Sequence, residues 1–171
     1  MKITQFPLHP DTPPEGMTLK QLFSGRSFDL EAAQEQLKML MAEQGLPYSE
    51  RTHTYNSRLA QELAKWAELQ PGGGVIHDAL FHAYFVDGIN LARVDKLVQI
   101  AGSVGLLEEE AREVLESRSF GPAVDGDWRR SSELGVTGVP TFVIEDRGVV
   151  GAQPYETLEQ LVAQSGAERR P

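Results

Sequence analysis

The residues of this chain that most readily bind metals or transfer protons are its four histidines. His77 and His82 lie five positions apart on a predicted helix, whereas two ligands on one helix face need a spacing of three or four. Neither a cysteine nor a tight group of acidic residues completes a metal site beside them. We therefore expect no metal site and no cofactor, and we interpret all the histidines as structural or surface residues: His9, His53, His77 and His82.

The common nucleophile motifs and phosphate loops are also missing from the sequence. The chain has no cysteine, which excludes a disulfide framework, a thiolate nucleophile and a redox-active dithiol within these residues. The glycines at 72–74 follow a predicted helix and lack the Lys-Ser or Lys-Thr of a phosphate loop, so we interpret them as a linker. No serine has the Gly-x-Ser-x-Gly context of a hydrolase. The sequence predicts no catalytic residue.

Composition and charge narrow the class of protein. The 171 residues are 40% hydrophobic and 24% charged, which is typical of a globular domain. Sixteen Lys and Arg against twenty-five Asp and Glu give a net charge of −9, so a basic surface for nucleic acid is not expected. The N-terminus lacks the apolar stretch of a signal peptide, and no segment approaches the length of a membrane span. We expect a cytoplasmic protein with no nucleic-acid or membrane partner.

The segment 135–144 stands apart from the rest of the sequence. Two glycines and Pro140 come immediately before the apolar run that begins at Thr141. A proline at the threshold of a strand is either a cis X-Pro peptide in a tightly specified turn or an ordinary trans-proline turn. Local chemistry leaves both readings open.

Hydrophobic periodicity predicts the elements that position this segment. Residues 2–8 alternate polar and apolar side chains and end at prolines, as a short strand near a sheet edge would. A helical block follows. Its first helix is capped by Asp29, and its second helix begins after Asn56 or Ser57. Further helices are predicted over residues 75–86, 93–103, 107–117 and 122–134.

We expect two of these helices to contribute whole apolar faces to the core. The helix after Asp29 is expected to bury Leu30, Ala33, Leu37, Leu40 and Met41. The helix 75–86, which we place at the middle of the helical layer, is expected to bury Ile76, Leu80, Phe81, Tyr84 and Phe85.

The C-terminal part is predicted to be a β-hairpin followed by a helix. The predicted strands are 141–144 and 149–151, joined by a tight turn at 146–148. The last helix starts at Pro154 and ends before a solvated tail at 168–171, and it buries Leu158, Leu161 and Val162. The order of elements predicts a small α/β core interrupted by a mostly helical insertion.

The sequence Gly-Val-Thr-Gly-Val-Pro-Thr-Phe-Val at 135–143 resembles the cis-proline loop of the DsbA family of thioredoxin-fold oxidoreductases. Flanking motifs are similar to the FrnE-like branch of that family, and they follow the family's order along the chain: residues 6–11, 13–16, 79–88 and 151–154. The resemblance implies an α/β, thioredoxin-like fold with a helical insertion. We expect residues 1–16 and 120–171 to form the thioredoxin-like half and residues 17–119 the insertion.

The same resemblance implies what is missing. In the family, the first strand and first helix precede the segment similar to residues 2–8, and the Cys-x-x-Cys or the serine of the isomerase branch lies at their junction. On this resemblance the fold is incomplete and both nucleophiles are absent. The absent strand would lie between residues 2–8 and the hairpin, where unpaired backbone groups are costly if buried. The gap could be filled in three ways: residues 2–8 pair with 141–145, a second copy fills it in a homodimer, or the natural chain is longer. We favour the homodimer or the longer chain.

The resemblance also implies the binding residues. Val139, Pro140 and Thr137 are expected to bind a peptide or protein substrate, with glutathione as a further candidate. Asn56 and Gln61 match a polar stretch of the family and are the other candidates, although Gln61 stands where the family has histidine. We expect the chain to belong to a family of thiol-disulfide oxidoreductases and to be inactive in dithiol exchange by itself. The alternatives are a non-catalytic binding module and a glutathione-dependent isomerase or transferase.

Overall fold

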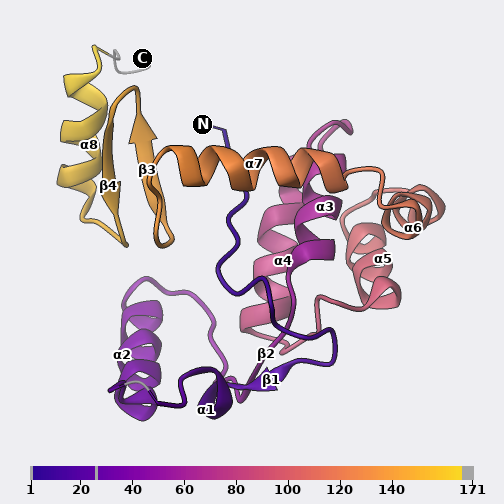
Figure 1. The fold of residues 1–171 in the computed structure, drawn as a ribbon, viewed down its shortest axis with the longest axis horizontal. Helices are drawn as coiled ribbons and strands as arrows, with labels where there is room; N and C mark the ends of the chain where they lie inside the picture. Colours follow the sequence, from indigo (N-terminus) through magenta and orange to yellow (C-terminus); the bar gives the residue numbers. More distant parts are fainter. Residues whose placement is uncertain (1, 26, 167–171) are drawn as a thin grey trace. The chain divides into compact units, whose positions relative to one another are not determined.

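The computed structural model describes residues 2–25 and 27–166, which are mainly helical (Figure 1). The chain divides into two compact units, residues 9–125 and residues 1–8 with 126–171. The expected division lay at residues 16 and 120 instead. Residues 9–16 and 120–125 group with the helical unit because Asn56 Nδ2 donates to the carbonyls of Pro10 and Thr12, and Arg58 binds Gly121 O and Asp125.

The helical unit contains a short N-terminal ladder and the packed helices that follow. Its elements are β1 Met17–Thr18, α1 Leu19–Leu22, α2 Leu30–Glu43, β2 His53–Thr54, α3 Arg58–Ala67, the 3-10 turn η1 Gly73–Val75, α4 Ile76–Phe85, α5 Val94–Ser103, α6 Glu108–Ser117 and the first turn of α7 Gly121–Glu133. The starts of α3, α5, α6 and α7 lie within one or two residues of the predictions. The two-residue β1–β2 ladder, in which Met17 faces Thr54, was not predicted because two residues carry no periodicity.

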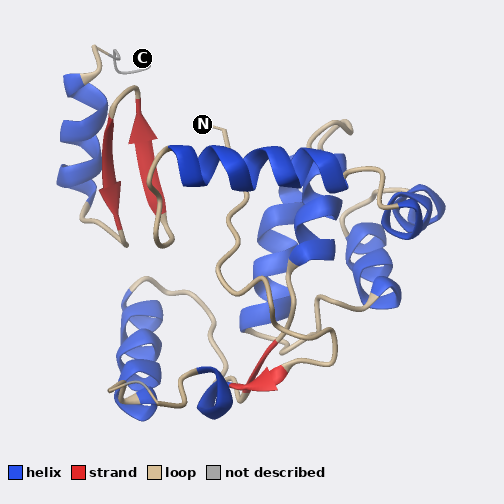
Figure 2. Ribbon diagram, in the orientation of Figure 1, coloured by secondary structure: helices blue, strands red, loops and turns tan. Residues whose placement is uncertain are grey.

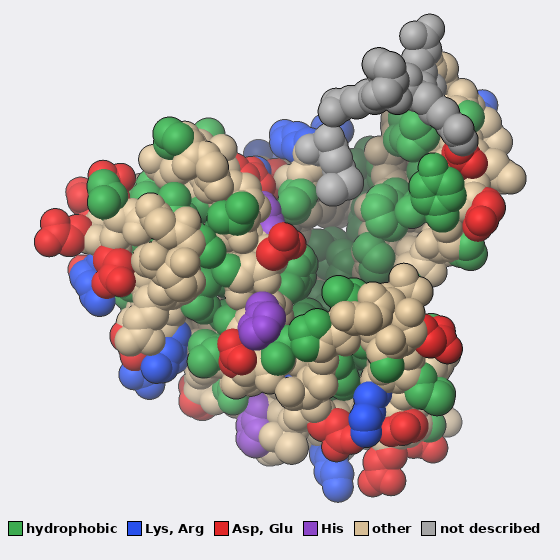
Figure 3. Space-filling model, turned by 180° about the vertical axis from the view of Figure 1, so that it is seen from behind, with side chains coloured by type: hydrophobic (Ala, Val, Ile, Leu, Met, Phe, Trp, Pro, Cys, Tyr) green, Lys and Arg blue, Asp and Glu red, His purple; other side chains and the backbone are tan. Residues whose placement is uncertain are grey.

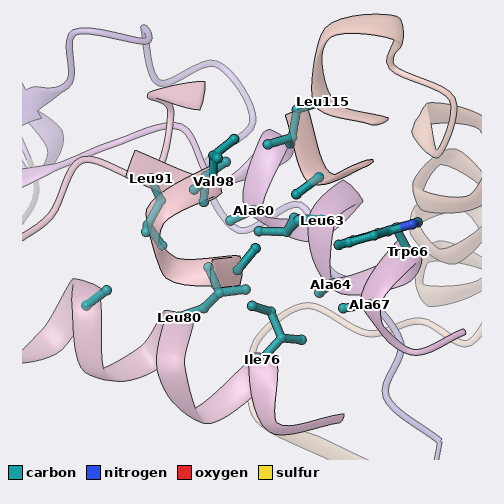
Figure 4. Packing of buried hydrophobic residues seen from close by; sticks show 14 residues of the cluster. Ala60, Leu63, Ala64, Trp66, Ala67, Ile76, Leu80, Leu91, Val98 and Leu115 are labelled. Atoms are coloured by element: carbon teal, nitrogen blue, oxygen red, sulfur yellow. The ribbon is translucent and has the colours of Figure 1, made fainter. Parts of the chain in front are cut away.

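The core of this unit is centred on α3 (Figure 4). Leu63 and Ala67 on α3 are completely buried, and they pack in one cluster with Ile76 of α4, Leu97 of α5 and Leu115 of α6. Side chains three and four positions apart on α3 share a face, and the packing partners of that face come from three later helices. The four helices therefore form one hydrophobic core.

The predicted core face of α2 is wrong, and that of α4 is right at the buried Ile76 and Leu80 but wrong at Phe81. Helix α2 begins at its expected cap, where Asp29 Oδ1 accepts from Ala32 N–H, but it contains no buried residue and Leu40 is 50% exposed. In α4, Phe81 is 60% exposed, and the middle of the layer is α3. Periodicity identifies residues that share a face, but it does not show what other element covers that face.

The second unit contains the hairpin β3 Thr141–Ile144 and β4 Arg147–Val150, the helix α8 Tyr155–Gln164 and the C-terminal part of α7. The ladder pairs Ile144 with Arg147, so the turn is Glu145–Asp146 and not 146–148. Glu145 takes the positive φ of 56° that a tight two-residue turn requires. In α8, Leu161 is buried as predicted, whereas Val162 is 43% exposed. The expected tail 168–171 lies outside the described residues.

Residues 2–8 do not form the predicted strand, and they appear as loop in Figure 2. Gln5 N–H donates to Asp127 Oδ2 over 3.0 Å, and Ser131 Oγ donates to Gln5 O over 3.2 Å. Both α7 side chains are buried. The main chain of this segment is therefore paired with side chains of α7, and among the described residues it forms no ladder with 141–145.

The net charge of −9 is reflected at the surface of the protein. On the face shown in Figure 3, acidic side chains are scattered and Lys and Arg form no continuous stripe. Among the described residues, no helix is both long and apolar enough to cross a membrane.

Candidate functional site

The loop before β3 begins at a well-defined helix end. Gly135, with φ of 67°, follows α7, and its N–H donates to Ser132 O. Val136 N–H donates to Ser131 O over 2.9 Å. These two bonds form a Schellman motif, in which glycine takes the left-handed conformation without a steric cost. The helix end thus sets the direction in which residues 136–140 leave α7.

Contacts at both ends of the Pro140 turn hold the loop against the hairpin. Thr141 Oγ1 donates to Gly138 O over 2.6 Å, and Gly151 N–H donates to Pro140 O over 2.7 Å. The Val139–Pro140 peptide bond is cis. The Val139 side chain is 48% exposed, and Thr137 and Pro140 are also exposed. The loop therefore presents the three predicted binding residues on one short, anchored segment.

One edge of the hairpin is unpaired. The bond from Gly151 to Pro140 and the register of the ladder make Phe142–Val149 and Ile144–Arg147 the hydrogen-bonded pairs. The N–H and C=O of Thr141 and Val143 therefore point away from β4. Within the described part of the chain, these groups and those of Val139 make no hydrogen bond. We call the main-chain groups of Val139, Thr141 and Val143 the open edge of β3.

The other two predicted residues belong to the helical unit, so the structure does not bring the five together in one unit. Asn56 Nδ2 donates to Pro10 O and Thr12 O, and its Oδ1 accepts from Arg58 N–H. Gln61 Nε2 donates to Ser57 Oγ over 3.2 Å. The polar atoms of Asn56 are engaged in fastening the segment 10–12, which is a structural role.

Sequence reasoning missed a buried ionic cluster next to Asn56. Glu62 is completely buried, and its carboxylate accepts bonds of 2.7 Å from Arg118 and 2.8 Å from Arg58. Burial by itself raises the pKa of Glu62, but the hydrogen bonds from Arg118 and Arg58 outweigh it and hold the pKa below its ordinary value. The spacing of Arg58 and Glu62 was a detectable signal, because residues four apart on a helix are neighbours.

The histidines make ordinary surface contacts. His77 Nε2 lies 3.0 Å from Glu68 Oε1, and His82 Nδ1 lies 3.2 Å from Asp87 Oδ2. Across residues 2–25 and 27–166, no group of three or more potential ligands could hold a metal ion.

A family model and similar proteins were found for this chain. The model of a DSBA-like thioredoxin domain matches residues 1–163. The protein YwbO of Bacillus subtilis (strain 168) is 28% identical over 112 residues, which are 65% of this chain and 56% of that protein. The crystal structure of a probable DsbA oxidoreductase from Streptomyces coelicolor has a TM-score of 0.85 and 29% identity, over 96% of this chain and 74% of the other.

A more distant structure shares the fold. A 2-hydroxychromene-2-carboxylate isomerase has a TM-score of 0.66 and 20% identity, over 80% of this chain and 66% of the isomerase. The chain spans 56% of the length of the curated relative that it matches.

Proposed function

Since the chain belongs to the DSBA-like thioredoxin domain family, we propose that it binds an extended polypeptide substrate of thiol-disulfide exchange along the open edge of β3. The observation that carries this proposal is the row of unpaired main-chain groups on Val139, Thr141 and Val143. An added strand takes its affinity from main-chain hydrogen bonds of this kind and its specificity from alternate side chains.

The exposed side chains beside the edge support the same function. Val139 is 48% and Val143 39% exposed, so an added strand would find apolar contacts as well as hydrogen bonds. Because main-chain hydrogen bonds do not depend on side-chain identity, the edge suits varied protein substrates. Glutathione, a short peptide, would offer fewer main-chain groups to the same edge.

The chemistry of exchange limits what these residues do. A thiolate must attack a disulfide sulfur, and a second thiol must resolve the mixed disulfide. The 171 residues contain no cysteine. In this proposal they supply the binding surface for the substrate and do not carry out dithiol exchange by themselves.

Two proline variants test the binding edge. Val143→Pro removes an N–H from the open edge of β3, and Val150→Pro removes the corresponding N–H from the outer edge of β4. Neither N–H takes part in the β3–β4 ladder, and proline is tolerated at such edge positions. We expect Val143→Pro to weaken binding of a fluorescein-labelled, cysteine-containing peptide about tenfold and Val150→Pro to change it less than about twofold.

Fluorescence anisotropy measures both affinities, and circular dichroism confirms that the two variants retain the hairpin and helices. Equal weakening by both variants would contradict the assignment of the edge. In a separate assay, the chain is expected not to accelerate reduction of insulin by dithiothreitol. Acceleration would show that exchange chemistry is present without cysteine, against this account.

A further inference from the structure

The helical unit contains a small pocket formed by its own residues. Its volume is about 190 Å³, and it is lined by residues 49–53, 55, 84 and 86–88. Arg51, His53 and Tyr55 occupy alternate positions along the segment that contains β2. All three line the pocket, together with the residues between Ser49 and His53. Tyr84 at the end of α4 lies on its other wall.

Arg51 is held in a fixed orientation. The centre of its guanidinium lies 4.6 Å from the ring centroid of Tyr84 and 4.7 Å from that of Phe85. These two rings contact each other edge-to-face with centroids 4.9 Å apart, and the Tyr84 hydroxyl is 3.1 Å from Thr54 Oγ1. A guanidinium placed on aromatic faces keeps its N–H groups available at its edge.

No anionic group in the described part of the chain pairs with Arg51. Its Nε is buried without a hydrogen-bond partner, and Arg51 forms no ion pair with any described residue. The two acidic residues that line the pocket contact other basic side chains. Glu50 Oε1 is 3.8 Å from Lys38 Nζ, and Asp87 Oδ2 is 3.2 Å from His82 Nδ1. A buried polar group without a partner is costly, so the site favours an acceptor supplied by a ligand.

We propose that the Arg51 pocket binds the carboxylate of a ligand. A carboxylate is planar and accepts two parallel bonds from a guanidinium. Its single negative charge is attracted by Arg51 and is repelled less by Glu50 and Asp87 than the two charges of a phosphate dianion would be. Pockets for whole drug-sized ligands are larger, at roughly 300 Å³ or more, so a terminal group fits better than a cofactor. The carboxylate belongs to a small organic acid or to a peptide C-terminus.

The Nε–Hε resonance of Arg51 reports binding directly. In a ¹H–¹⁵N spectrum of the full chain, the signal that disappears in Arg51→Lys is that of Arg51. We expect it to shift saturably, in the millimolar range, on titration with propionate or with N-acetyl-Ala-Ala. Tighter binding of the peptide would identify a C-terminus as the source of the carboxylate, and tighter binding of propionate a small acid.

Four controls, two with other ligands and two with variants, make the test decisive. The same peptide as its C-terminal amide is expected to leave the signal unmoved, and inorganic phosphate at equal ionic strength to bind more weakly than propionate. Arg51→Gln is expected to weaken binding about tenfold or more, as seen in the backbone signals of residues 52–55, while Arg112→Gln, an equal change of charge on α6, leaves it unchanged. An Arg51 signal that does not move with either carboxylate, or that moves equally with the amide, would overturn the proposal.

Discussion

Among single residues, Glu62 has the most demanding environment in the described chain. Its carboxylate has no exposed surface, and Arg58 and Arg118 supply the hydrogen bonds that replace water. Half of the Arg118 side chain remains exposed, which places the cluster at the boundary between core and solvent. A buried ion pair adds little relative to an apolar core, but removing one partner leaves an uncompensated charge.

Replacing Glu62 by Gln is therefore expected to destabilise the helical unit by about 3 kcal/mol, because Arg118 loses its anionic partner beside the core and Arg58 keeps only Asp125. Urea unfolding followed by Trp66 fluorescence measures the change. Glu116→Gln, an exposed residue on α6, is the matched control and should change stability by less than about 0.5 kcal/mol. A loss of similar size in both variants would contradict the structural role of the cluster.

The pH dependence follows from the same residue. The pKa of Glu62 lies lower in the folded than in the unfolded chain, so its contribution to stability is full above the ordinary pKa of 4.5 and is lost as pH falls through the folded value. The stability difference between the natural chain and Glu62→Gln should shrink as pH is lowered from about 7 toward 3. A difference that stays constant over this range would be inconsistent with an ionised Glu62.

The sequence allows only part of this cluster to be predicted. Arg58 and Glu62 are neighbours on any helix, whereas Arg118 is 56 positions from Glu62 and meets it through tertiary packing alone. For the same reason, the loop residues Val139 and Pro140 could be proposed from the resemblance of one contiguous segment, but the partnerless Nε of Arg51 required the structure. Distant pairing leaves no local pattern.

At the scale of elements, the turn from α3 into α4 shows why Gly73 is required and Gly74 is not. A Cβ on Gly73 would collide with the main-chain carbonyl of Ala67, whereas a Cβ on Gly74 meets nothing within 4 Å. The predicted linker 72–74 overlaps the 3-10 turn η1 Gly73–Val75, which leads directly into α4.

We expect Gly73→Ala to cost about 2 kcal/mol, because the backbone of Ala67 must move. Gly74→Ala at the neighbouring position should change stability by less than about 0.5 kcal/mol. Thermal unfolding of the two variants under identical conditions measures the contrast. Equal melting temperatures would indicate that the turn relaxes freely, contrary to the packing described.

Other elements show where periodicity succeeds and fails. Helices α3, α5 and α6 were predicted correctly because their apolar stripes coincide with the faces they bury. Residues 2–8 alternate like a strand, but Asp127 and Ser131 take the hydrogen bonds of Gln5. An alternating pattern specifies two faces and leaves the hydrogen-bond partner undetermined.

At the scale of the whole molecule, the large hydrophobic cluster lies entirely within one unit. All fourteen of its buried residues fall between Ala60 and Leu115. A domain with its own core can fold alone. We expect a fragment of residues 9–125 to unfold cooperatively with heat, and Leu63→Ala to destabilise it by about 3 kcal/mol. Circular dichroism checks both, and a fragment without a cooperative transition would contradict the division.

The open edge of β3 gives the homodimer prediction a physical form. A second copy that added a strand there would compete with a peptide for the same main-chain groups. On this proposal, binding of the peptide should shift the chain toward monomer in sedimentation velocity. The cytoplasmic location likewise stays a prediction.

Residue-resolved amide exchange on the full chain tests the central claim, that an extended peptide pairs with the open edge of β3. With saturating peptide, we predict slower exchange of the Val139, Thr141 and Val143 N–H groups, and unchanged exchange at Gly148 and Val150 on the opposite edge of the hairpin. Protection confined to β4 or to the helical unit, with the three β3-edge amides unchanged, would contradict the account.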